Sequence, residues 1–259
     1  MTAIATRLSS GLDRLGQFFW FVADVVRGFG KRPFELAEAV EQGWALSRVV
    51  IVPTALVSIP LGAVVALQVG SLTQQLGAQS FAGAASVVSI LREGAPLATA
   101  LLLAGAGGSA ICADLGSRTI REEIDAMRVL GIDPVPRLVV PRVLAAMVVS
   151  VLLTGVVMGV GISGGYFFNV VLQHGTSGVY VESFRALATT PDVYASLAKG
   201  LVFGAIAAVV GSYKGLHAQG GPRGVGQAVN ESVVVNFLLI FTANYLMSVA
   251  YFQLVPSGA

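Results

Sequence analysis

The chain has 259 residues, of which 55% are hydrophobic and only 12% are charged, with a net charge of +2 and a mean hydropathy of +0.78. Because a soluble domain carries about 25% charged residues, this composition excludes an ordinary soluble enzyme and indicates a polytopic membrane protein. The single cysteine, Cys112, excludes an intramolecular disulfide.

The N-terminal residues, 1–44, are predicted to lie at the membrane surface. Between 12 and 29, apolar side chains recur at helical spacing opposite charged ones, and residues 18–21 are all aromatic, which is typical of the headgroup zone. This stretch is too charged to span a bilayer, so we expect an in-plane interfacial helix, with a core helix of a soluble cap as the alternative. A polar helical turn or two is expected over 33–44.

The remaining residues, 45–259, are predicted to form one all-α transmembrane domain. A span needs roughly 20 apolar residues, and long tracts without Asp, Glu, Lys or Arg meet this requirement. They predict five transmembrane helices, at about 48–72, 88–113, 140–170, 193–213 and 228–252. In the third of these, Gly155 and Gly159, and then Gly161 and Gly165, are spaced for close helix contact, either within the chain or at a dimer seam.

The basic residues predict the orientation of these helices. Thirteen of the sixteen Lys and Arg fall within 1–48, 114–142 and 214–227. Since basic loops stay on the cytoplasmic side, we expect a cytoplasmic N-terminus, a cytoplasmic glycine-rich loop over 215–226, and an outer connection over 172–192.

The densest cluster of charge lies between the second and third spans. Apolar residues recur there at helical spacing, Thr119 and Glu122 fit a capping box, and Gly131 suits a helix C-terminus. The pattern predicts a short cytoplasmic amphipathic helix over 117–130. Such a helix could receive force from a separate ATPase, and a merely solvated loop helix is the alternative.

No chemistry of an enzyme is evident in the sequence. There is no GxxxxGK[ST] loop, so the chain binds no nucleotide by that route. The two histidines, His174 and His217, are expected on opposite faces, and no spacing predicts a metal site. We therefore assign no catalytic or metal-binding residue, and we expect no cofactor in this chain and no nucleic-acid partner.

Residues 91–142 resemble the hallmark region of the MlaE/YrbE family, the permease subunits of ABC transporters that work with MCE-domain lipid carriers. The most specific matches are EEIDAM at Glu122–Met127 and GIDP at Gly131–Pro134, and ALQ at Ala66–Gln68 and GSYKGLHAQGGPRGVGQAVNESVV at Gly211–Val234 also match. The resemblance covers roughly 45–250 and is greatest to the actinobacterial YrbE branch, in which two different permeases pair. Two departures are Ala106, where many relatives carry an arginine, and Asp114, where glutamate is usual.

The resemblance implies a multi-pass permease subunit of the plasma (inner) membrane, which moves lipids or other hydrophobic molecules across the cell envelope. It implies four kinds of partner: a second permease, two ATPase subunits that bind the ATP, MCE-domain proteins and the lipid. The helix over 117–130 would be the coupling helix that seats in the ATPase. Its coupling residues would be Arg118, Ile120, Arg121, Glu122, Glu123, Ile124, Asp125 and Met127.

Three charges within the spans are the candidate substrate site. Arg92, Glu93 and Lys199 lie in or beside apolar segments, and an ionised residue at mid-bilayer costs about 2.5–3.5 kcal/mol, so they must lie at the outer edge or face a polar cavity. The resemblance associates them with an outward-facing lipid pocket. We expect them to bind a polar or anionic headgroup, with the acyl chain held by Leu97, Leu101, Val65 and Val69. The alternative is structural, with Glu93 neutralising a cation and Lys199 extending to the headgroups.

Two other functions are weighed against a permease. A secondary transporter would need intramembrane acids for ion coupling and usually has internal repeats, and no repeat is evident. A structural membrane scaffold of an envelope complex is the second alternative.

Overall fold

A computed structural model describes residues 2–30, 36–78, 81–172 and 176–254, and the regular structure within them is entirely helical. Residues 33–35 and His174 lie outside the described residues. The elements are α1 (Thr2–Gly28), α2 (Leu36–Gln75), α3 (Ala82–Ser89), η2 (Ile90–Gly94), α4 (Ala95–Leu102), η3 (Leu103–Gly107), α5 (Gly108–Ile120), α6 (Glu123–Val129), η4 (Val135–Val139), α7 (Val140–Tyr166), η5 (Phe167–Leu172), α8 (Ser177–Leu187), α9 (Thr190–Leu216) and α10 (Gly221–Leu254). The η elements are π-helical turns within longer helices.

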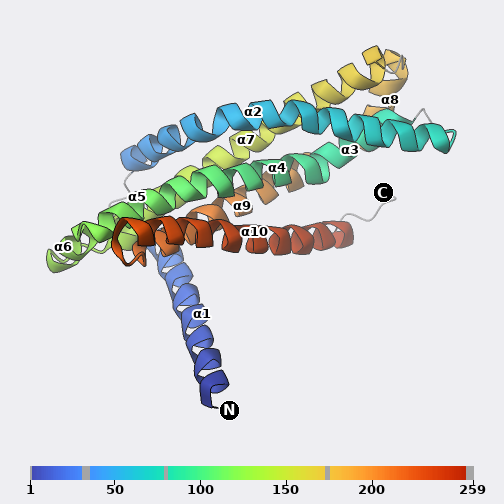
Figure 1. Cartoon of the computed structure of the whole chain (residues 1–259). Helices are drawn as coiled ribbons and strands as arrows, with labels where there is room; N and C mark the ends of the chain where they lie inside the picture. Colours follow the sequence, from blue (N-terminus) through green and yellow to red (C-terminus); the bar gives the residue numbers. More distant parts are fainter. Residues whose placement is uncertain (1, 31–35, 79–80, 173–175, 255–259) are drawn as a thin grey trace.

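Five helical segments of the described chain are long and apolar enough to cross a membrane. They are Leu36–Gln75, Ala82–Ile120, Val135–Leu172, Thr190–Leu216 and Gly221–Leu254. The all-α membrane fold and its five expected spans are therefore confirmed. The segments form one elongated bundle, with α6 at one end and α8 at the other (Figure 1). We refer below to the α6 end and the α8 end.

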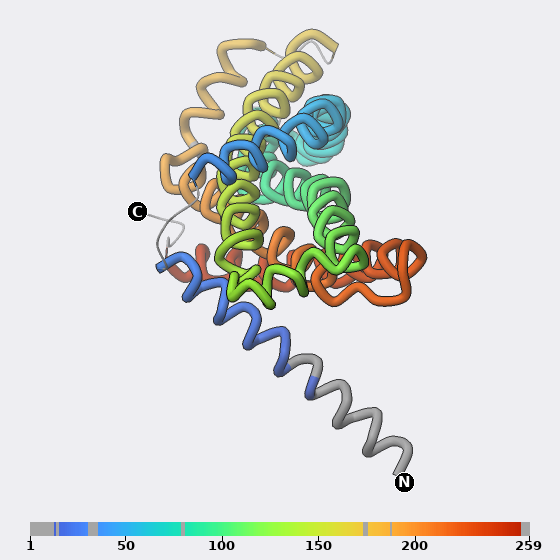
Figure 2. Tube along the Cα trace, turned by 90° about the vertical axis from the view of Figure 1, so that its left-hand side faces the viewer, coloured from blue at the N-terminus to red at the C-terminus, as the bar shows by residue number. Residues whose placement is uncertain are grey.

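Helices α7 and α9 form the centre of the bundle. Helix α7 packs against α2, α4 and α9, while α9 also packs against α5 and α10 (Figure 2). Glycines make these crossings close. A Cβ on Gly204 would lie 2.6 Å from the carbonyl oxygen of Ala146 in α7, and a Cβ on Gly211 would lie 2.7 Å from that of Gly108 in α5. No other residue fits either position without moving a helix.

The close α7–α9 crossing gives a testable prediction. Gly204→Ala is expected to destabilise the protein by about 1–3 kcal/mol, because the added methyl group has backbone rather than a flexible side chain in front of it. Gly155→Ala is the matched control, since a Cβ at Gly155 meets nothing within 4 Å. Thermal unfolding in detergent compares the two. Equal melting temperatures for both variants would contradict the packing described here.

The two glycine pairs of the third span differ in their surroundings. Gly161 faces Ile90 and Gly165 faces the hydroxyl of Tyr180, so this pair serves packing within the chain. Gly155 and Gly159 face open space on the described chain. Only Gly161 and Gly165 therefore follow the alternative of packing within the chain.

Helix α1 leaves the bundle at a steep angle, with its N-terminus far from the other helices (Figure 1). Its last turns hold it in place. The rings of Phe18 and Phe21 lie 5.2 and 5.4 Å from the ring of Tyr213 in α9, and Val25 is buried in the core. The expected helix over 12–29 is thus part of a longer one, and its location at the membrane surface stays a prediction.

Two connections contain more helix than expected. The connection over 172–192, which was predicted to lie on the outer side, includes α8, which packs against α3. The segment over 215–226 was expected to be a loop, but only residues 217–220 lie between α9 and α10. Gly220 and Gly221, with φ of +84° and +70°, turn the chain, and Pro222 suits the first turn of a helix because its missing N–H would have no helical acceptor there.

Candidate functional site

The charged segment between the second and third spans is two helices rather than one. Helix α5 continues from the second span to Ile120, and α6 begins at Glu123 after Glu122, whose φ of +62° is left-handed. The predicted capping box is wrong, because Thr119 lies inside α5 and its hydroxyl donates to the carbonyl of Leu115 at 2.9 Å. The left-handed residue redirects the chain so that α6 lies across the end of the bundle (Figure 1).

The end of α6 agrees with the sequence. Gly131 has a φ of +75°, its N–H donates to the carbonyl of Arg128 at 3.0 Å, and the N–H of Ile132 donates to that of Met127 at 2.9 Å. These two bonds are a Schellman motif, which satisfies carbonyls that the helix end would otherwise leave free. The C-terminal role predicted for Gly131 is confirmed.

The apolar stripe of this segment faces the bundle. Ile124 is buried in the main core with Met127 packed beside it, and Ile120 packs against a small cluster around Cys112. Two side chains of the same segment point away instead: Val129 is 86% exposed and Leu130 is 75% exposed. We call Val129 and Leu130 the α6 tip.

The charged side chains of the segment are largely paired with one another. Arg121 lies 3.1 Å from Glu123, and Arg128 lies 2.9 Å from Asp125. Arg118 points back toward the bundle and contacts Asp114 at 3.3 Å. Glu122, Glu123 and Asp125 are exposed, so their carboxylates remain accessible to a partner.

The second group of predicted residues is brought together at a π-helical turn. Arg92 and Glu93 lie on η2, and Lys199 projects from α9 toward them. Its ammonium group donates to the carboxylate of Glu93 and to the backbone carbonyl of Arg92, both at 2.8 Å. That carbonyl lacks the usual helical donor, because the residue four positions later is Pro96, which has no N–H.

Lys199 has no donor left for a further ligand. Its third contact is the hydroxyl of Ser248 in α10, at 2.8 Å, and an ammonium group has three donors. Its side chain is only 4% exposed. The hydroxyl of Ser248 donates in turn to Glu93 at 2.7 Å, and the side-chain amide of Asn244 donates to the other oxygen of Glu93 at 2.8 Å.

Arg92 pairs with a residue that the sequence placed in the outer connection. Its Nε lies 2.6 Å from the carboxylate of Asp192, which is fully buried and also accepts from the hydroxyl of Tyr251. Asp192 closes a capping box with Thr189 at the start of α9. The Arg92 side chain keeps 29% of its surface exposed, so among the two cations it is the more accessible.

We call this set the Arg92–Lys199 cluster: Arg92, Glu93, Asp192, Lys199, Asn244, Ser248 and Tyr251. The sequence predicted three of its members. The three polar residues of α10 were missed, although their spacing of four and three positions puts them on one face of an otherwise apolar helix. The clue for Asp192 was Thr189 three positions before it, which fits the capping-box pattern.

The four residues expected to hold an acyl chain are not gathered in one place. Leu97 packs against the main core and Val65 against a separate cluster near the α8 end. Leu101 and Val69 are half-buried. The structure has a hollow of about 380 Å³ between α7 and α8 and another of about 310 Å³ at the α6 end, and none of the four lines either one.

The fold defines the chain as a multi-pass membrane protein, built around a bundle of five candidate spans. The chain belongs to the MlaE permease family of ABC transporters. The model of this family, described as Permease MlaE, matches residues 39–250. Among its relatives is a probable ABC transporter permease protein of Synechocystis, 37% identical over 193 residues, which are 74% of this chain and 73% of the relative.

Two further relatives widen the comparison. A probable ABC transporter permease protein of Rickettsia felis is 30% identical over 251 residues, or 97% of each chain. The chloroplastic protein TRIGALACTOSYLDIACYLGLYCEROL 1 of Arabidopsis thaliana is 31% identical over 179 residues, which are 69% of this chain and 51% of the plant protein. The family predicted from the sequence is therefore confirmed.

Proposed function

We propose that this chain is the membrane subunit of an ATP-driven transporter that moves lipids or other hydrophobic molecules across the cell envelope together with MCE-domain proteins. In this proposal it pairs with a second permease, and two separate ATPase subunits bind and hydrolyse the ATP. Family membership supports the permease role. A lipid substrate is supported by the Arabidopsis relative, because its name, TRIGALACTOSYLDIACYLGLYCEROL 1, contains the name of a galactose-bearing lipid.

The observation that carries the ATPase partnership is the position of α6. This short helix joins two spans and lies at the end of the bundle (Figure 1). It exposes both acids and apolar side chains. Buried Ile124 fixes it to the bundle, so a force applied to its exposed face passes to α5 and α7. Such a helix is suited to serve as the coupling helix.

The test is a charge reversal on the exposed face. Glu122→Lys combined with Asp125→Lys is expected to lose the ATPase or to uncouple hydrolysis from transport, because charge-assisted contacts at a desolvated interface are worth about 1.5–3 kcal/mol each. Glu182→Lys, an exposed acid on α8 at the other end, is the control. Co-purification of the ATPase and transport in reconstituted vesicles are measured. Wild-type transport by the double variant would rule out this role for the acids.

The proposed location is the plasma (inner) membrane, with the N-terminus and the α6 end in the cytoplasm. In a Cys112→Ala background, Arg128→Cys is expected to react with a membrane-impermeant maleimide only after lysis. Gly178→Cys, exposed at the α8 end, is expected to react in cells whose outer envelope has been permeabilised. Labelling of the cysteine at 128 from outside would contradict this orientation.

For the substrate headgroup, the geometry favours fewer contact residues than the three predicted from the sequence. Lys199 uses its three donors within the protein, whereas Arg92 retains exposed surface beside the aromatic rings of Tyr251 and Phe252. We therefore propose that Arg92 contacts a polar or anionic headgroup and that Lys199 and Glu93 position it. The acyl-chain role predicted for Leu97, Leu101, Val65 and Val69 stays a prediction, because Leu97 and Val65 pack against different clusters.

A further inference from the structure

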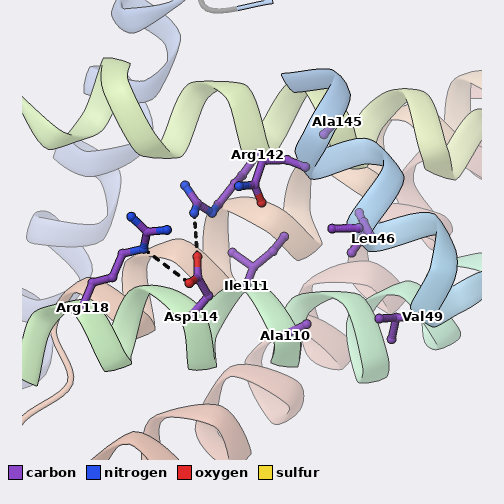
Figure 3. A pocket seen from close by; sticks show the side chains of 10 residues that line it. Leu46, Val49, Ala110, Ile111, Asp114, Arg118, Arg142 and Ala145 are labelled. Atoms are coloured by element: carbon purple, nitrogen blue, oxygen red, sulfur yellow. Dashed lines mark hydrogen bonds and ion pairs between the residues drawn. The ribbon is translucent and has the colours of Figure 1, made fainter. Parts of the chain in front are cut away.

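A hollow of about 310 Å³ lies at the α6 end, apart from the Arg92–Lys199 cluster (Figure 3). Its walls come from the first turns of α2, from α5 and from the start of α7. The lining residues are Gln42, Ala45, Leu46, Val49, Ala110, Ile111, Asp114, Arg118, Arg142 and Ala145. Its volume is at the lower end of the range for small-molecule sites, which suits a headgroup rather than a whole lipid.

The polar wall of the hollow contains an incompletely satisfied arginine. Arg142 is only 1% exposed, and its terminal nitrogens donate to the carbonyl of Leu138 at 2.7 Å and to the carboxylate of Asp114 at 2.6 Å. Its Nε is buried and has no hydrogen-bond partner among the described residues. A buried donor without a hydrogen-bond partner destabilises the protein, and the cost is larger when the donor belongs to a charged group such as this guanidinium. An acceptor on a ligand would remove this cost.

The charges of the lining favour an anion. Arg118 and Arg142 both contact Asp114, one on each carboxylate oxygen (Figure 3), so two cations share one anion. Gln42 lines the same wall, and Glu38, one turn before it, lies outside the lining and accepts a hydrogen bond from the amide of Gln42 at 2.9 Å. Among the lining residues, two arginines thus face one carboxylate, and the carboxylate of Glu38 acts on Arg142 from outside the lining.

The opposite wall is apolar and reaches the surface of the bundle. Leu46, Val49 and Ile111 line it, and Val49 of α2 and Ala110 of α5 are both exposed, so the hollow opens sideways between these two helices. The charged residues lie toward the helix ends and the apolar ones toward the middle of the bundle. This order of polarity matches an amphiphile that lies with its head toward the α6 end.

We propose that this hollow binds the phosphate-bearing headgroup of a membrane phospholipid, with the phosphate at Arg142 and Arg118 and the first acyl carbons along Leu46 and Val49. In the proposed orientation the lipid would come from the cytoplasmic leaflet. The inference concerns a second site and goes beyond the proposed function, because it requires binding and not transport. Its failure would leave the transport proposal unchanged.

Binding is tested on the full-length chain, purified in detergent and stripped of lipid, by isothermal titration calorimetry with three probes. Short-chain dihexanoyl-phosphatidylglycerol is expected to bind saturably. Dihexanoylglycerol, which lacks the phosphate, and inorganic phosphate, which lacks the chains, are each expected to bind at least about tenfold more weakly, since either loses half of the contacts (1.4 kcal/mol is tenfold in affinity). Equally tight binding of inorganic phosphate would overturn the assignment to a lipid.

Variants then locate the binding. Ala110→Trp fills the mouth of the hollow without changing a charge and is expected to weaken phospholipid binding at least tenfold. Ala113→Trp, exposed on the same helix but outside the lining, is the matched control. Arg118→Gln is expected to weaken binding severalfold while leaving the bonds of Arg142 in place. Unchanged affinity of both Ala110→Trp and Arg118→Gln, with melting temperatures like that of the wild type, would overturn the site.

Discussion

Lys199→Met is expected to destabilise the bundle by about 3 kcal/mol, because it leaves the carboxylate of Glu93 inside the protein without its cation. Breaking a buried ion pair by removing one partner typically costs about 3–5 kcal/mol, and the partial exposure of Glu93 puts this pair at the lower end. The loss is measured by thermal unfolding in detergent. The double variant with Glu93→Gln is expected to recover most of it, since no charge is then left unpaired.

A second lysine provides the comparison. Lys214 and Glu231 form an ion pair of the same length, 2.8 Å, but both side chains are more open to solvent. Lys214→Met is expected to cost less than about 1 kcal/mol, as exposed pairs do. If Lys199→Met melts like the wild type and nevertheless loses bound lipid, Lys199 itself binds the headgroup, and its proposed positioning role is wrong.

Val129→Asp combined with Leu130→Asp is expected to weaken association with the ATPase at least about tenfold. Both side chains of the α6 tip are among the most exposed apolar groups of the chain, and the nearby acids are already paired with arginines on the same segment. Fully burying a Val or Leu side chain is worth about 1.5–3 kcal/mol, so the loss of both apolar contacts accounts for an effect of this size. Co-purification of the ATPase with the membrane subunit measures the effect.

The control for this variant is Val179→Asp, an exposed apolar residue on α8 at the other end of the bundle. It is expected to leave the ATPase bound. Since neither residue of the α6 tip contributes to the core, the double variant should insert and fold normally. Recovery of the ATPase in wild-type yield with the α6 tip replaced would show that the acids alone hold the partner.

Much of the fold could be predicted because a bilayer requires long apolar helices, and the sequence contains long tracts without charged residues. Gly131 was also predictable, since the bonds that end α6 are local. The break at Glu122 was not, because nothing local in the sequence marks this glutamate as a left-handed residue. The Thr-x-x-acid pattern occurs at both Thr119 and Thr189, and only the surrounding structure decides which one caps a helix.

The candidate site was predicted in part for a related reason. Charges within apolar spans are conspicuous, so Arg92, Glu93 and Lys199 could be found. Their partners could not be assigned, because pairing depends on which faces of α9 and α10 meet η2. Arg142 and Asp114 were missed as a possible site because each lies in a segment that is already rich in charge, and nothing local distinguishes them from their neighbours.

The pairing in the Arg92–Lys199 cluster also bears on how the helices find their alignment. Arg92 and Glu93 neutralise each other's charge on one span, as Asp192 and Lys199 do on another, so each span can enter the bilayer without net charge from these residues. In the folded bundle the partners are exchanged, Arg92 with Asp192 and Lys199 with Glu93. The two anchors on α9 are seven residues apart, about 10 Å along the helix. Sliding α9 by a single turn would break both pairs at once, so the exchanged pairs select one register during assembly.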